Sequence, residues 1–92
     1  MNSQRSPAPL TQEELRRFEA KYVTEIDGCW YWIATTTHSG YGLFHRVARK
    51  QMEQAHRVSY AHYKGMIPDD REIDHICRSR SCVRPDHLEL VT

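Results

Sequence analysis

Two cysteines and a histidine near the C-terminus have the spacing of a zinc site. Cys77 and Cys82 are separated by four residues, as are Cys82 and His87. Thiolates and imidazole are the preferred ligands of structural zinc, which takes four in a tetrahedron. Cys29 is the one other cysteine of the chain, and we predict it as the fourth ligand. Small buried apolar cysteines are the alternative, but arginine and proline between them do not resemble a core strand.

Asp74 and His75 lie directly before this segment. An imidazole can accept a proton from an attacking water. A carboxylate can help to hold a Mg²⁺ or Mn²⁺ ion that offsets charge on a scissile phosphate. The pair therefore predicts metal-assisted phosphodiester hydrolysis, with His75 as the general base and Asp74 as the magnesium ligand. A further zinc ligand or an ordinary surface histidine are the alternatives for His75.

The composition describes one small globular domain. The chain has 92 residues, of which 39% are hydrophobic and 27% charged. No apolar run approaches the roughly 20 residues that cross a bilayer, so we expect no membrane partner. The N-terminus has no apolar signal core, so we expect a cytoplasmic, reducing location. An odd number of cysteines there favours metal binding over disulfides, and zinc would stabilise a core this small.

The net charge of +1 says little about nucleic acid, but the basic residues form two clusters while most acids lie elsewhere. Two local basic patches suit contact with phosphates. A solvated surface with scattered arginines is the alternative. The predicted DNA contacts are Arg46, Arg49, Lys50, Arg57, Arg78, Arg80 and Arg84.

The elements that must position these residues indicate an α+β fold. Residues 1–10 are expected to form a flexible tail and residues 11–92 a single domain. Thr11 and Glu14 fit a capping box that begins a helix. The expected helices are 12–21 and 55–63, the expected strands 29–33, 41–45, 51–53 and 72–75, and the three strands of 29–53 are expected to form an antiparallel meander.

The last segment resembles a known family. Asp74-His75-Ile76-Cys77 and the stretch from Cys82 to Thr92 resemble the zinc-containing HNH endonucleases that are common in bacteriophage genomes. They are also similar to the His-Cys box homing endonucleases, and both belong to the His-Me finger (ββα-metal) group. Residues 28–32, 40–42, 55–60 and 67–68 extend the resemblance upstream, so that it covers about residues 28–92.

The resemblance implies a role for each matching residue. His75 matches the general base, and Asp74 matches the carboxylate beside the catalytic metal. The zinc ligands match Cys77, Cys82, His87 and the distant Cys29. Residues 41–53 would lie against double-stranded DNA, and Arg57 would either face a phosphate or pack its helix. A phage origin would place the protein in the cytoplasm of a bacterial host.

Two departures from the family pattern bear on activity. Arg84 stands where these sequences usually carry asparagine before the proline. The family also continues after Val-Thr into a helix whose Asn or His completes the magnesium site, whereas this sequence ends at Thr92. We therefore expect a truncated final helix. Either the sequence is a truncation, or the fold serves a task other than cutting.

Three functions remain open from the sequence. The first is a metal-dependent DNA endonuclease of phage or mobile-element type. The second is a catalytically degenerate HNH-fold protein that binds DNA, or that acts as a phage inhibitor by binding a host protein. The third is a structural zinc domain in a larger assembly, with Trp30, Tyr31 and Trp32 at an interface.

Overall fold

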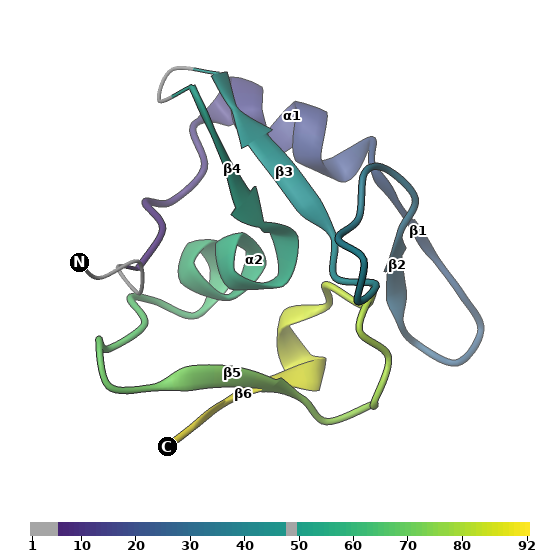
Figure 1. Ribbon diagram of the computed structural model, residues 1–92. Coiled ribbons are helices and arrows are strands. Elements are labelled where there is room, and N and C mark those ends of the chain that lie inside the picture. The colour runs from purple at the N-terminus through teal and green to yellow at the C-terminus, as the bar shows by residue number, and fades with distance from the viewer. Residues whose placement is uncertain (1–5, 48–49) are drawn as a thin grey trace.

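A computed structural model describes residues 6–47 and 50–92 as a small α+β fold (Figure 1). None of the helices within these residues is long and apolar enough to cross a membrane. The elements are α1 (Gln12–Glu19), β1 (Tyr22–Thr24), β2 (Trp30–Trp32), β3 (Leu43–Arg46), β4 (Gln51–Gln54), α2 (Ala55–Tyr63), β5 (Glu72–His75), the 3₁₀ helix η2 (Pro85–His87) and β6 (Leu88–Val91).

The strands form three separate antiparallel pairs, β1 with β2, β3 with β4, and β5 with β6. The α+β class with antiparallel strands is thereby confirmed, but the predicted three-stranded meander is wrong. β2 pairs with β1 on one edge. On its other edge the backbone amide of Trp32 donates to Ser81, and Trp30 accepts from Val83. Both edges of β2 are therefore occupied, and β3 pairs with β4 instead.

The core is aromatic and joins α1 to the first two strand pairs. Phe18 is fully buried and its ring lies 5.0 Å from that of Trp32 and 5.2 Å from that of Phe44. α2 lies between the β3–β4 pair and the β5–β6 pair, and it adds Ala55 and Val58 to the same core (Figure 1). This helix thus holds the first half of the chain against the segment that carries the chemistry.

The capping box predicted at Thr11 and Glu14 is present and begins α1. The predicted tail is partly wrong, because residues 6–10 pack on the body, whereas residues 1–5 lie outside the described part. Leu10 is buried and its amide donates to His62 Nδ1 at 3.1 Å. Ser6 Oγ accepts from the amide of Ile67 at 2.9 Å. The segment before α1 therefore contacts the last turn of α2 and the segment that follows this helix.

Candidate metal centre and active-site cleft

Three cysteines and one histidine converge from distant parts of the chain. Cys29 follows a turn and enters β2, Cys77 and Cys82 lie in the segment between β5 and η2, and His87 ends η2. Their ligand atoms all lie within 4.8 Å of one another. The four residues that the spacing predicted as ligands are therefore brought together, and the group could hold a metal ion.

The separations within this Cys/His cluster fit a tetrahedral ion. His87 Nδ1 lies 3.5 Å from Cys29 Sγ and 3.6 Å from Cys82 Sγ. Zinc bonds of about 2.3 Å to sulfur and about 2.0 Å to nitrogen, at tetrahedral angles, put S and N about 3.5 Å apart. Burial raises the pKa of the Cys82 thiol to about 12, so a bound cation would be needed to stabilise its thiolate. Donor type and geometry thus fit zinc.

The turn before Cys29 is tied to the rest of the cluster by Arg84. Arg84 Nη1 donates to the carbonyl of Gly28 at 2.8 Å. Gly28 has a φ of +91°, and a Cβ there would lie 3.1 Å from the same guanidinium nitrogen. Asp27 Oδ1 accepts from the amide of Cys29 at 2.9 Å. Arg84 was predicted to contact DNA; its hydrogen bond to Gly28 connects the turn before Cys29 with the segment that carries Cys82 and His87, and 36% of its side chain remains exposed.

A polar cleft of about 470 Å³ opens beside the Cys/His cluster. Asp74 and Glu89 stand directly opposite each other in the β5–β6 pair, and both line this cleft. Sequence reasoning missed Glu89, because only the strand register brings it to Asp74. The full lining is Tyr41, Asp74, His75, Ile76, Arg78, Arg80 and Glu89.

His75 ends β5 and is 8% exposed. Its Nε2 is buried and has no hydrogen-bond partner within the described residues. Burial lowers the pKa of His75, while the backbone of Cys82 and the charge of Asp74 oppose the shift. A lowered pKa keeps the imidazole neutral at pH 7, which a general base requires.

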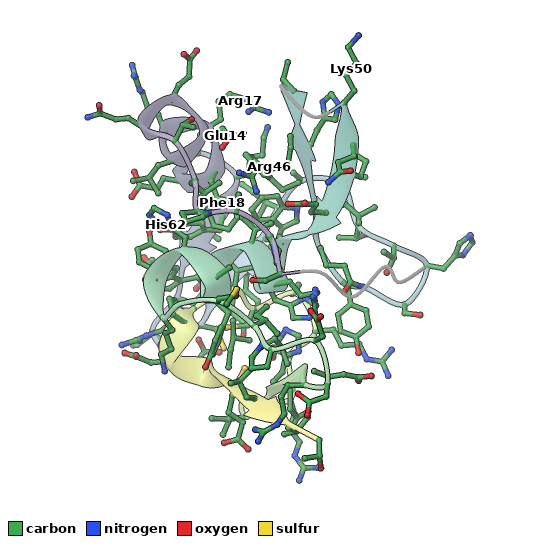
Figure 2. All side chains as sticks on the ribbon, turned by 90° about the vertical axis from the view of Figure 1, so that its left-hand side faces the viewer. Glu14, Arg17, Phe18, Arg46, Lys50 and His62 are labelled. Atoms are coloured by element: carbon green, nitrogen blue, oxygen red, sulfur yellow. The ribbon has the colours of Figure 1, made fainter. Side chains whose placement is uncertain are left out.

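The predicted DNA contacts separate into different environments. Arg78 and Arg80 are exposed and line the cleft. Arg78 has a left-handed φ of 63°, which is uncommon for a residue with a side chain. Lys50 is exposed and extends from the end of the β3–β4 pair away from the body (Figure 2). Arg57 is half-buried, and burial lowers its pKa. Arg49 lies outside the described residues.

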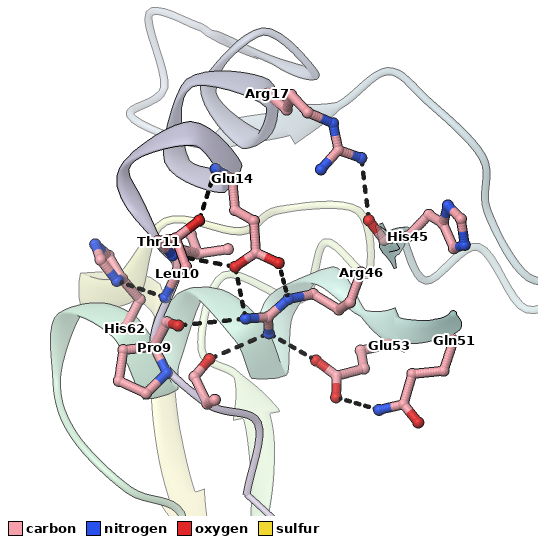
Figure 3. A network of polar contacts seen from close by, with 11 residues as sticks. Pro9, Leu10, Thr11, Glu14, Arg17, His45, Arg46, Gln51, Glu53 and His62 are labelled. Carbon is pink, nitrogen blue, oxygen red and sulfur yellow. Dashed lines mark hydrogen bonds and ion pairs between the residues drawn. The ribbon is translucent and has the colours of Figure 1, made fainter. Parts of the chain in front are cut away.

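Arg46 was predicted to contact DNA, and this prediction is wrong. Its side chain is 2% exposed and forms ion pairs with Glu14 at 2.8 Å and Glu53 at 2.9 Å. The same guanidinium donates to the carbonyls of Ala8 and Pro9 (Figure 3). No donor remains for a phosphate, so Arg46 joins α1, the β3–β4 pair and the segment before α1.

The β5–β6 pair, most of the Cys/His cluster and most of the cleft lie in one segment that is similar to the HNH endonucleases. Residues 53–92 match the model of an HNH endonuclease family. The match begins in β4. It includes the adjacent residues Asp74 and His75, three of the four cluster residues, and Glu89. The resemblance to phage-type HNH endonucleases is thereby confirmed for this segment.

A phage protein is similar in sequence to about half of the chain. Over 46 residues the sequence is 41% identical to the uncharacterized gene 5.3 protein of Enterobacteria phage T3. The aligned part is 50% of this chain and 46% of the phage protein, so the chain spans about half of that relative's length. No solved structure matches the chain.

Proposed function

We propose that this protein is a metal-dependent DNA endonuclease of phage or mobile-element type. One observation carries the proposal: the buried His75 and the exposed Asp74 line the same cleft as two arginines, Arg78 and Arg80. This combination supplies a neutral base, an oxygen ligand and positive charge around one space, which are the requirements of phosphodiester hydrolysis. The match of residues 53–92 to the HNH endonuclease family supports it.

The Cys/His cluster would hold a structural zinc ion. Four protein ligands fill a tetrahedron, which leaves no open position for substrate and argues for a structural role. Cys29 would join β2 to the segment between β5 and η2, which carries Cys77 and Cys82. The zinc would thereby fix the end of β5 and with it His75, only two residues before Cys77.

In the reaction, the His75 imidazole would accept a proton from the water that attacks phosphorus. Asp74 would hold the divalent ion, with Glu89 as a second carboxylate in the same cleft. A bound Mg²⁺ or Mn²⁺ supplies positive charge at the scissile phosphate and the leaving oxygen. Arg78 and Arg80 would bind non-bridging phosphate oxygens. The P–O bond to the leaving oxygen breaks as the water oxygen bonds to phosphorus, and solvent supplies the leaving oxygen's proton.

Nicking of supercoiled plasmid DNA tests the proposal. Zinc-loaded wild type should nick DNA in the presence of Mg²⁺ or Mn²⁺ but not of EDTA. His75→Ala should lower the rate by about 10²–10⁴-fold, the usual contribution of a general base. His38→Ala, an exposed histidine outside the cleft, is the matched control and should cut at the wild-type rate. Metal-independent cutting, or equal cutting by His75→Ala, would reject the proposal.

A second function, DNA binding without cutting, is favoured by one observation. Among residues 6–47 and 50–92, the Cys/His cluster is the one group of three or more ligand atoms close enough to hold an ion. The cleft therefore presents Asp74 and Glu89 without a third protein ligand nearby. A degenerate nuclease of this kind would bind DNA or a host protein through the same arginines.

Binding through the cleft can be measured whether or not DNA is cut. Arg78→Asn removes the charge with a residue that tolerates the left-handed backbone. If Arg78 contacts a phosphate, this change should weaken DNA binding and reduce the slope of log K against log salt by about 1. Arg16→Gln, at an exposed position on α1, is the control and should leave the slope unchanged. Equal slopes for Arg78→Asn and wild type would exclude this contact.

A further inference from the structure

Two aromatic rings pack against the imidazole of His75. The ring of His56 lies 4.7 Å from it at 46°, and the ring of Tyr41 lies 5.7 Å from it at 38°. Tyr41 and His56 also contact each other at 5.4 Å. The three rings come from the segment before β3, the first turn of α2 and the end of β5. They form a triangle that links three separate elements at the cleft.

His56 is an unexpected residue at its position. It is 5% exposed, and its Nδ1 has no hydrogen-bond partner within the described residues. A buried polar atom without a partner destabilises the fold, and an apolar side chain at this position would avoid that cost. The other such side-chain atom in the described part of the chain is Nε2 of His75, on the ring that His56 contacts. An unpaired polar group of this kind calls for a functional explanation.

The orientation of His75 needs such a contact. The last torsion of a histidine side chain is broad and roughly two-fold, so the backbone of β5 does not decide which nitrogen faces the cleft. Contacts on the ring itself must decide it, and those that the structure gives are with the backbone of Cys82 and with the rings of His56 and Tyr41. Tyr41 is held in turn by Arg80, whose guanidinium lies 5.5 Å from the tyrosine ring and donates to Ser39. His56 is anchored in the first turn of α2.

We propose that His56 is a positioning residue for His75, and that its ring holds the His75 imidazole in the orientation that turns its proton-accepting nitrogen to the cleft. The inference rests on the proposed function of His75 as general base. Burial, with the charges of His75 and Arg57, lowers the pKa of His56 to about 3. His56 is therefore neutral near pH 7 and does not repel the proton that His75 accepts.

The kinetic test compares His56→Ala, which removes the ring, with His56→Phe, which keeps it. Misplacing a catalytic group by about 1 Å can cost about 10²-fold. His56→Ala should therefore lower kcat by about 10–100-fold with KM within about threefold of wild type, and His56→Phe should recover most of kcat. His62→Ala is the control. It removes a histidine of the same helix, together with the hydrogen bond that His62 accepts from the Leu10 amide, and leaves the ring contacts of His75 in place.

A second readout does not depend on cutting. Long-range ¹H–¹⁵N correlation of the histidine rings in the zinc-loaded protein reports the tautomer and mobility of His75. One sharp tautomer is expected in wild type, His56→Phe and His62→Ala, and a mixed or broadened signal in His56→Ala. If His56→Ala does not fold, His56→Leu, which is apolar but has no flat ring, replaces it.

The outcomes separate this inference from the proposed function. A wild-type protein that does not cut but shows the expected His75 signals would reject the nuclease and support the positioning role. Unchanged His75 signals in His56→Ala would overturn the positioning role, even if that variant loses activity through instability. Loss of kcat in His56→Phe equal to that in His56→Ala would overturn it as well.

Discussion

Single donor atoms decide what the Cys/His cluster can bind. Cys29 and Cys82 approach Nδ1 of His87, rather than Nε2, at distances that suit bonds to one shared ion. Cys29 and Cys82 are buried, whereas Cys77 and His87 are partly exposed. An ion held there would exchange from the side of Cys77 and His87, while the buried sulfurs would anchor it in the body of the protein.

Removing a ligand atom should therefore unfold the protein, and not only change its surface. We expect Cys29→Ser and His87→Ala to lose bound zinc and cooperative thermal unfolding, because structural zinc contributes on the order of 10 kcal/mol to folding. Zinc content by mass spectrometry and melting by circular dichroism measure the two effects. His38→Ala should keep one zinc per chain and the wild-type melting temperature. Wild-type zinc affinity in His87→Ala would contradict the ligand set.

Residue chemistry predicted which side chains converge in the Cys/His cluster better than it predicted the environments of the arginines. A Cys and His pattern specifies its own partners, because few other arrangements satisfy thiols and imidazole at that spacing. An arginine does not, because its partners are set by the fold. Arg46 forms an ion pair with Glu14, 32 positions away, and Arg84 donates a hydrogen bond to the carbonyl of Gly28. Charge clusters in the sequence could not distinguish these arginines from the exposed Arg78.

At the scale of elements, the turn between β1 and β2 has two tasks. It places Cys29 in the Cys/His cluster, and its Gly28 carbonyl accepts a hydrogen bond from Arg84. Gly28→Ala should be destabilising for two reasons. Its left-handed φ costs a non-glycine residue about 1–2 kcal/mol, and the new Cβ would press on Arg84 Nη1. Gly40→Ala has nearly the same φ, +94°, with nothing within 4 Å, so it isolates the first cost.

Chemical denaturation of the two glycine variants gives the comparison. The free energy of unfolding should fall further in Gly28→Ala than in Gly40→Ala, and zinc affinity should fall in Gly28→Ala alone. Equal losses, with unchanged zinc affinity in both variants, would mean that the contact between Gly28 and Arg84 does not support the Cys/His cluster.

The elements themselves were predicted where local chemistry determines them. The capping box at Thr11, the helix Ala55–Tyr63 and the strand Glu72–His75 are all present. β1 was missed, because three residues in a polar segment carry little periodic signal, and its pairing with β2 depends on tertiary contacts. His56 and Glu89 were missed as site residues for the same reason, since only packing and strand register bring them to His75 and Asp74.

At the scale of the whole molecule, Arg46 and its partners fasten the N-terminal half. The pKa of Glu14 is lowered from 4.5 to about 2, mainly because the Glu14 carboxylate accepts hydrogen bonds from Arg46. A lowered carboxyl pKa means that the ion pair stabilises the fold fully above about pH 4.5. That stability is lost as the pH falls from about 4.5 towards 2.

Glu14→Gln should lower the free energy of unfolding at pH 7 by about 2 kcal/mol, because hydrogen bonds to charged groups contribute about 1.5–3 kcal/mol. The difference from wild type should shrink below pH 4.5, since wild type then loses the same charge. Urea unfolding at pH 7 and at pH 3 measures both values. Glu13→Gln lies in the same first turn but is exposed, so it should change little at either pH. A deficit in Glu14→Gln that is independent of pH would refute the role of the charge.

The position of Cys29 in the chain has a kinetic consequence. It is 58 positions from His87, whereas Cys77, Cys82 and His87 lie within one short segment. Closing a long loop is slow and entropically costly, but a short one closes readily. Cys77, Cys82 and His87 can thus bind an ion before the rest of the chain has folded. Cys29 then only has to reach an ion that is already bound to the same chain. Refolding speed, and not stability alone, should therefore increase with zinc concentration.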